Sequence, residues 1–73
     1  MIGATVQRIN GLLDRVRIEA KEVAGLVDIE VKVGGETKYV EERLRPELAE
    51  YLLDFLLRVL LLEKGSLGLP ELP

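Results

Sequence analysis

The chain has 73 residues, with 10 Lys and Arg against 13 Asp and Glu, a formal net charge of −3 and no His or Cys. This length predicts a single domain that buries only about 60% of the surface its unfolded chain exposes. The lack of Cys excludes a disulfide framework and a thiolate metal site. Without His or Cys the usual general base, thiol nucleophile and soft metal ligands are missing, so we expect no enzyme, no cofactor and no metal.

Composition and charge also bear on partners and on location. The net charge of −3 argues against nucleic acid as the main partner. Few amide side chains with abundant Glu, Arg, Leu and Val are typical of a thermostable protein, although a GC-rich genome or a designed sequence would give the same pattern. Residues 1–6 lack the basic region and long apolar core of a secretory signal, which predicts a cytoplasmic protein.

Residues 5–24 have an apolar series with helical spacing, and this predicts an amphipathic helix. Thr5 is suited to cap its N-terminus and Gly25 to follow its C-terminus. Two features favour strands instead: Asn10-Gly11 is a typical hairpin dipeptide, and residues 15–21 alternate between polar and apolar side chains. We prefer the helix because its series is longer, and the choice between helix and strands stays open. The series consists of Val6, Ile9, Leu13, Val16, Ala20, Val23 and Val27.

Residues 27–33 alternate between Val or Ile and charged side chains, which predicts a half-buried strand. Gly34-Gly35 then closes a hairpin with residues 36–42. A two-residue loop would pair Val33 with Glu36 and Val31 with Lys38. A three-residue loop would pair Val33 with Thr37 and Val31 with Tyr39, and we predict this second register because it keeps one face apolar.

Residues 46–64, PELAEYLLDFLLRVLLLEK, predict a second helix that starts with Pro46 in its first turn and ends at Gly65. The stretch between Leu52 and Leu62 is apolar except for Asp54 and Arg58. A membrane span needs about 20 mostly apolar residues, so this helix is not expected to cross a bilayer. Residues 66–73 contain two prolines and are predicted to form a non-helical tail.

The predicted fold is therefore a small α+β domain over residues 1–65, in the order helix, β-hairpin, helix (αββα), with residues 66–73 as the tail. The second helix has a narrow charged stripe, and its other sides are apolar. A 73-residue monomer cannot cover that much apolar surface, so we expect oligomerisation to complete the fold. The charged stripe consists of Glu47, Glu50, Asp54 and Arg58. The leucines expected at the interface are Leu53, Leu56, Leu57, Leu60 and Leu61.

The function predicted from these features is a non-enzymatic, homo-oligomeric module for protein–protein interaction and assembly, with the chain itself as partner and an unspecified number of copies. One alternative is a small adaptor or accessory subunit that docks a larger protein through its tail, with Leu67, Leu69 and Leu72 making the contacts. Within that tail region the sequence GSLGL, residues 65–69, resembles the C-terminal cargo-loading peptides of encapsulin nanocompartments, and Pro70 departs from their pattern. The resemblance implies docking in an extended form.

A second alternative is a dimeric DNA-binding regulator that uses Arg15 and Arg17, although neighbouring acidic residues interrupt the basic ones. For chemistry, the nearest acidic clusters are Glu41-Glu42 and the pair Glu19 and Glu22. Carboxylates of this kind can act as an acid/base pair or bind Mg²⁺. Charge runs of this type are usually solvated faces, so neither cluster is predicted to be a site.

Overall fold

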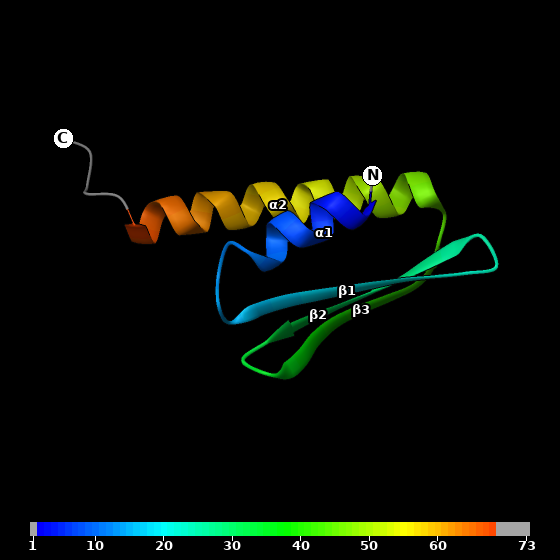
Figure 1. The fold of residues 1–73 in the computed structure, drawn as a ribbon, viewed down its shortest axis with the longest axis horizontal. Coiled ribbons are helices and arrows are strands. Elements are labelled where there is room, and N and C mark those ends of the chain that lie inside the picture. Colours follow the sequence, from blue (N-terminus) through cyan, green and yellow to red (C-terminus); the bar gives the residue numbers. More distant parts are fainter. Residues whose placement is uncertain (1, 69–73) are drawn as a thin grey trace.

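The computed structural model describes residues 2–68, with side chains as far as residue 65. A helix, three strands and a second helix follow one another: α1 (Ile2–Asn10), β1 (Val16–Val23), β2 (Leu26–Val33), β3 (Glu36–Leu44) and α2 (Pro46–Gly68). The strands form one antiparallel sheet in the order β1-β2-β3. Both helices lie on the same side of this sheet (Figure 1). The predicted α+β class is confirmed, but the order is αβββα rather than αββα.

The predicted helix over residues 5–24 is wrong beyond Asn10. The amide N–H of Gly11 donates to the carbonyls of Gln7 and Arg8 at 3.1 and 3.2 Å, which closes α1 at its last turn. The chain then enters β1, where Val16 and Ile18 are buried and their neighbours are exposed. The strand alternation prevails here because β-branched side chains pack well on a half-buried sheet and Asn10-Gly11 stops the helix.

Asn10 also fastens the end of α1 to the open edge of β1. Its side-chain Nδ2 donates to the carbonyl of Ile18 at 3.1 Å, and the N–H of Ile18 donates to its Oδ1 at 2.7 Å. The amide thus replaces the neighbouring strand that β1 lacks on this side, where β1 is the edge of the sheet. An edge strand with satisfied backbone groups is a poorer template for unwanted pairing.

Both hairpins turn through two residues with positive φ. The β1–β2 turn uses Ala24 (φ 54°) and Gly25 (φ 79°), and the β2–β3 turn uses Gly34 (φ 61°) and Gly35 (φ 87°). Two consecutive positive φ values are characteristic of the type I′ turn, whose twist matches that of the strands. Gly25 is therefore a turn residue rather than the end of a helix.

The predicted register of the second hairpin is half correct. Val31 pairs with Tyr39 as predicted, but Val33 pairs with Glu36 across the two-residue turn. A register shift between Val31 and Lys32 leaves Lys38 as an extra residue, a β-bulge. This bulge reconciles a tight Gly-Gly turn with an apolar face that continues along β2 and β3.

A second irregularity lies at the end of β3. Val27 pairs with Leu44, whereas Ile29 pairs with Glu41, so β3 has one extra residue in this stretch. Arg43 takes a φ of 58° there, and its N–H donates to Oδ1 of Asp28 at 2.9 Å. The carboxylate accepts a backbone donor that the bulge removes from the ladder.

The core lies between the helices and the sheet. Its contributors come from every element: Ile9, Ile18, Val27, Ile29, Leu44, Ala49, Leu53 and Leu57. α1 packs against both β1 and α2, while α2 packs against β2. Hence α1 occupies the space between β1 and α2 and decides which side of α2 is covered.

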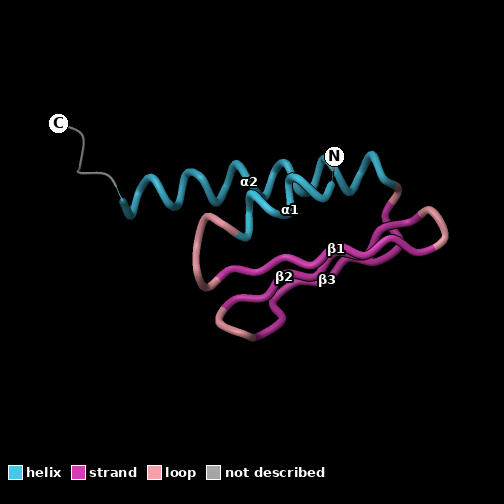
Figure 2. The backbone as a smooth tube through the Cα atoms, in the orientation of Figure 1, coloured by secondary structure: helices cyan, strands magenta, loops and turns pink. Residues whose placement is uncertain are grey.

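α2 is the longest element of the domain. Its 23 residues span about 34 Å at 1.5 Å per residue, and its C-terminal end projects beyond α1 and the sheet (Figure 2). The helix continues to Gly68, so the predicted end at Gly65 is wrong, as is the non-helical assignment of residues 66–68. The last five residues of the predicted tail, 69–73, lie outside the described residues.

Candidate interaction surface

α2 has one apolar face turned toward its own domain. Ala49 and Leu53 have no exposed surface, Leu57 is 5% exposed, and Leu56 and Leu60 are half-buried against the core. At 100° per residue these five positions span an arc of about 100° on the helix surface. We call these five residues the inner face of α2. Its width is that of an ordinary amphipathic helix.

A second apolar face of α2 is directed away from the core, except for Leu52 at its border, which also packs against the core. Its members are Leu48 (53% exposed), Tyr51 (71%), Leu52 (half-buried), Phe55 (55%), Val59 (40%) and Leu62 (76%). We call these six residues the outer face. They also span an arc of about 100°, centred about 130° from the centre of the inner face. The helix thus has two separate apolar faces.

The outer face is energetically costly if it stays in water. Burying a Leu or Phe side chain contributes about 1.5–3 kcal/mol relative to leaving it exposed. Single exposed apolar residues are common on proteins, whereas contiguous apolar patches mark interaction sites. Leu60 is the last residue of α2 found against the core cluster among those with described side chains, and Leu61 and Leu62 after it do not belong to that cluster.

A charged line separates the two faces on one side. Arg58 Nε and Asp54 Oδ2 lie 3.0 Å apart, four residues from each other along the helix, and both side chains are more than half exposed. Glu47 and Glu50 are exposed on the same side. The predicted charged stripe is therefore found, and its ion pair is solvated. An exposed pair of this kind contributes only a few tenths of a kcal/mol.

The five leucines predicted at the interface are divided by the structure. Leu53 and Leu57 are buried in the core of the same protomer, and Leu56 and Leu60 are half-buried against it. Leu61 is 42% exposed, but by helical position it lies among the charged line. Only one protomer is described, so contact between these leucines and a second copy stays a prediction. Leu53 and Leu57 nevertheless have almost no surface left for a partner.

The residues that make up the outer face were not predicted from the sequence. The signal was present, because Leu48, Leu52, Phe55, Val59 and Leu62 are spaced 4-3-4-3. This is the heptad spacing of a coiled-coil seam. It went unused because the helix is apolar on so many sides that other leucine series with similar spacing overlap it.

The members of each candidate acidic cluster lie on different faces of the sheet. Register puts Glu22, opposite Val27, on the helix-facing side of the sheet, and Glu19, opposite Glu30, on the other side. Glu19 Oε2 instead lies 3.3 Å from Nζ of Lys32. Among the described residues no group of three or more acidic side chains could hold a metal ion, and no side-chain nitrogen or oxygen is buried without a partner.

Glu41 and Glu42 are separated in the same way. Glu41 pairs with Ile29 on the helix-facing side, and Glu42 lines a hollow with Glu19 on the other side.

The pKa of Tyr39 is raised, mainly by partial burial and to a smaller extent by the neighbouring Glu41 carboxylate. A phenol with a raised pKa stays protonated at neutral pH and is no general base.

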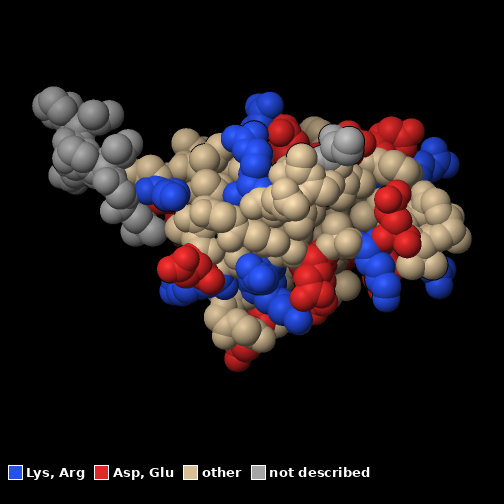
Figure 3. Space-filling model, viewed as in Figure 1, with Lys and Arg blue, Asp and Glu red and all other residues tan. Residues whose placement is uncertain are grey.

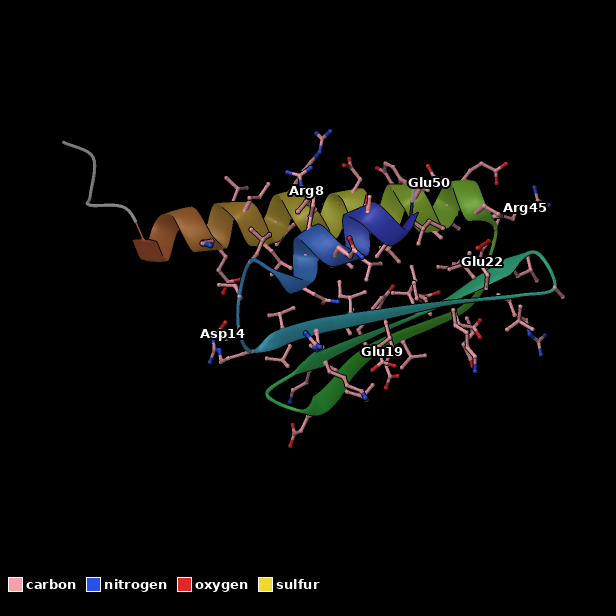
Figure 4. All side chains as sticks on the ribbon, viewed as in Figure 1. Arg8, Asp14, Glu19, Glu22, Arg45 and Glu50 are labelled. Atoms are coloured by element: carbon pink, nitrogen blue, oxygen red, sulfur yellow. The ribbon has the colours of Figure 1, made fainter. Side chains whose placement is uncertain are left out.

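The basic residues are mixed with acidic ones. Figure 3 shows Lys and Arg interspersed with Asp and Glu on the face in view. Arg8 and Arg45 lie well apart, with Glu50 between them (Figure 4). Arg15 and Arg17 line a hollow that also contains acidic side chains. Neither the face in Figure 3 nor this hollow is continuously basic, and DNA binding stays a prediction.

Most of the tail residues predicted to dock a larger partner are outside the part of the chain that the structure describes. Leu69 and Leu72 lie outside the described residues. The backbone of Leu67 belongs to α2, and so do its neighbours Gly65, Ser66 and Gly68. This part of the GSLGL sequence is helical here rather than extended. Docking through the tail stays a prediction.

Within the described residues no helix is long and apolar enough to cross a membrane. Comparison with protein-family models, with curated proteins and with solved structures finds no match for this chain. The function of the chain is therefore inferred from its own chemistry, and above all from the outer face of α2.

Proposed function

We propose that the chain is a non-enzymatic assembly module that associates with further copies of itself through the outer face of α2. The observation that carries this proposal is the outer face itself, in which five apolar side chains are 40–76% exposed on one side of one helix. Packing this face against a partner removes it from water and stabilises the assembly through the hydrophobic effect.

The projecting end of α2 supports the same proposal. Short helices without tertiary contacts are marginally stable in water, and most helical stability in proteins comes from packing of an apolar face. Leu61 and Leu62, 42% and 76% exposed, lie in the part of α2 beyond the last core contact. A second helix alongside would provide the packing that the protomer's own core does not.

The composition of the outer face suits protein association. Aromatic residues are enriched at the centres of protein interfaces, and this face has Tyr51 and Phe55 beside its leucines. The opposite surface of the sheet is different: it has Lys32 paired with Glu19, and Thr37 donating to the Glu30 carboxylate. These four side chains have partners within the protomer, whereas the exposed side chains of the outer face of α2 are mostly apolar.

Two neighbouring leucines allow a matched test. Leu62 is on the outer face, and Leu61 is about 100° away on the charged side. By light scattering coupled to size exclusion, we expect the unmodified protein to have at least twice the 8.2 kDa mass of one chain. The measurement is made at about 100 μM, where a micromolar dissociation constant leaves little monomer. Leu62→Glu is expected to give monomers, and Leu61→Glu is expected to leave the assembly intact.

Other results would count against the proposal. A monomer at every concentration would overturn it. Dissociation by Leu61→Glu but not by Leu62→Glu would move the interface to the charged side of α2. Circular dichroism of each variant separates loss of assembly from loss of folding.

A further inference from the structure

The heptad spacing of the outer face assigns each of its residues a coiled-coil position. Leu52 and Val59 take position a, and Leu48, Phe55 and Leu62 take position d. The same register places Tyr51 and Arg58 at position g, and Leu56 and Glu63 at position e. Leu at d and a β-branched residue at a favour two parallel strands. The outer face meets this pattern at Leu48, Leu62 and Val59.

The flanking charges distinguish the two orientations of a helix pair. In a parallel pair in register, position g of one helix lies beside position e of the next heptad of the other, five residues further on. Arg58 and Glu63 have this separation (63 − 58 = 5). An antiparallel pair places g beside g and e beside e, which directs Glu63 toward the partner's Ala49 or Leu56. The parallel arrangement therefore matches opposite charges, and the antiparallel one does not.

Both charged groups are free to make this contact. Arg58 Nε lies 3.0 Å from Oδ2 of Asp54 in an ion pair, and a guanidinium has five N–H donors, so its terminal nitrogens remain for another carboxylate. Glu63 is exposed, and among the described residues it has no ion pair within its own protomer. An Arg58–Glu63 contact between copies would form twice across a two-fold axis.

The apolar flank has the same separation. Tyr51 and Leu56 are also five residues apart (56 − 51 = 5), so in a parallel pair each Tyr51 ring lies over the partner's Leu56. Tyr51 is the most exposed of the two aromatic side chains on the outer face, at 71%. Leu56 is half-buried at the border of the protomer's own core. The contact would thus extend the core of one protomer with a ring from the other.

We propose that the occupant of the outer face is α2 of a second copy, parallel and in register, with Arg58 paired to the partner's Glu63 and Tyr51 packed on the partner's Leu56. This rests on the proposed self-association and adds its orientation. The inner face, with α1 and the sheet behind it, is centred about 130° away from the seam, so the rest of the domain does not occupy the partner's place.

The absence of Cys makes orientation directly measurable. Leu48→Cys and Leu62→Cys are made separately, with Lys64→Cys as the control on the far side of the helix. In a parallel pair each d-position thiol faces its own copy. Mild oxidation of either variant alone is then expected to give a disulfide-linked dimer at least about tenfold faster than Lys64→Cys, because pairing raises the effective thiol concentration.

Each outcome decides between arrangements. Rapid linkage of both d-position variants alone supports the parallel pair. Rapid linkage of Leu62→Cys only when it is mixed with an a-position variant, Leu52→Cys, shows an antiparallel pair, in which position a faces position d; this overturns the inference and leaves self-association standing. Rates equal to that of Lys64→Cys in a chain that light scattering finds oligomeric also overturn it. Equal rates in a monomeric chain overturn the proposed function as well.

Charge exchange gives an independent readout. In a parallel pair Arg58→Glu and Glu63→Arg each place like charges side by side in their own dimers, while a mixed dimer restores both attractions. Differently tagged variants mixed at low salt are expected to form mixed dimers well above the statistical half. A statistical mixture would show that Arg58 and Glu63 are not neighbours across the interface.

Discussion

The inner and outer faces of α2 consist of similar residues but have different surroundings. The inner face, with Leu53 and Leu57, packs on a core that includes Ile9 of α1 and Ile18 of β1. On the outer face, Phe55 and Leu62 are 55% and 76% exposed. Hydrophobicity alone therefore does not decide which side of a helix is buried. The position of α1 decides it, because α1 fills the space beside the inner face.

The largest expected effect comes from breaking the inner face. Leu53→Ala removes a fully buried side chain and is expected to lower the free energy of unfolding by about 2–5 kcal/mol. Leu62→Ala, 76% exposed, is expected to lower it by less than about 0.5 kcal/mol where monomers dominate. Urea unfolding at low protein concentration measures both. Equal losses would mean that the two faces are not distinct.

A smaller effect is expected from weakening the attachment of α1 to β1. This attachment matters because α1 covers the inner face of α2. Asn10→Ala removes both hydrogen bonds to the Ile18 backbone and is expected to cost about 1–3 kcal/mol, because Ile18 is buried and its polar groups lose their partner. Hydrogen exchange at the Ile18 amide should accelerate. Gln7→Ala, exposed on the same helix, is the control and should change stability by less than about 0.5 kcal/mol.

Much of the sheet and of α2 followed from sequence pattern. The alternation of residues 27–33, the Gly-Gly turn and the Pro46 start of α2 all depend on local chemistry, and each is found. Strand β1 was missed because Val16, Ala20 and Val23 fit a helical series as well as a strand. Local spacing is ambiguous there, and contact with β2 and α1 settles the conformation.

The candidate surface was harder to predict than the fold. An apolar helix in a small α+β domain implies a covered side and an uncovered side, and the sequence shows both. Which leucines belong to which side depends on how α1 is placed across β1. The Asn10–Ile18 contact fixes that placement, and the helical prediction had put both of these residues in one helix. The interface prediction therefore included Leu53 and Leu57, which are buried in the protomer's own core.

Ala24 and Gly25 of the β1–β2 turn are exposed and lie outside the core cluster, so a variant there tests stability without altering the comparison. Ala24 takes a φ of 54°, a conformation that costs an L-residue about 1–2 kcal/mol and that Asn tolerates better. Ala24→Asn is expected to raise the free energy of unfolding by about 0.5–1 kcal/mol. Gly25→Ala at φ 79° should change it in the opposite direction. Thermal unfolding compares the two, and the mass of the assembly should stay unchanged in both.

The smallest expected effect concerns the charged line between the faces. Arg58→Ala breaks the exposed pair with Asp54 and should cost the monomer only about 0.3 kcal/mol, since water and salt screen such pairs. The loss should disappear in about 1 M salt, where the screening length falls to about 3 Å. Lys64→Ala, with no ion pair among the described residues, is the control.

Protein concentration turns this small effect into a sharper test of the two faces. If Arg58 serves only its own helix, the cost of Arg58→Ala is the same at low and high protein concentration. If the outer face pairs with a second copy, Arg58 also loses the partner's Glu63, and the cost grows as dimers replace monomers. Urea unfolding across a dilution series separates these cases, because α2 contributes to monomer stability through one face and to assembly through the other.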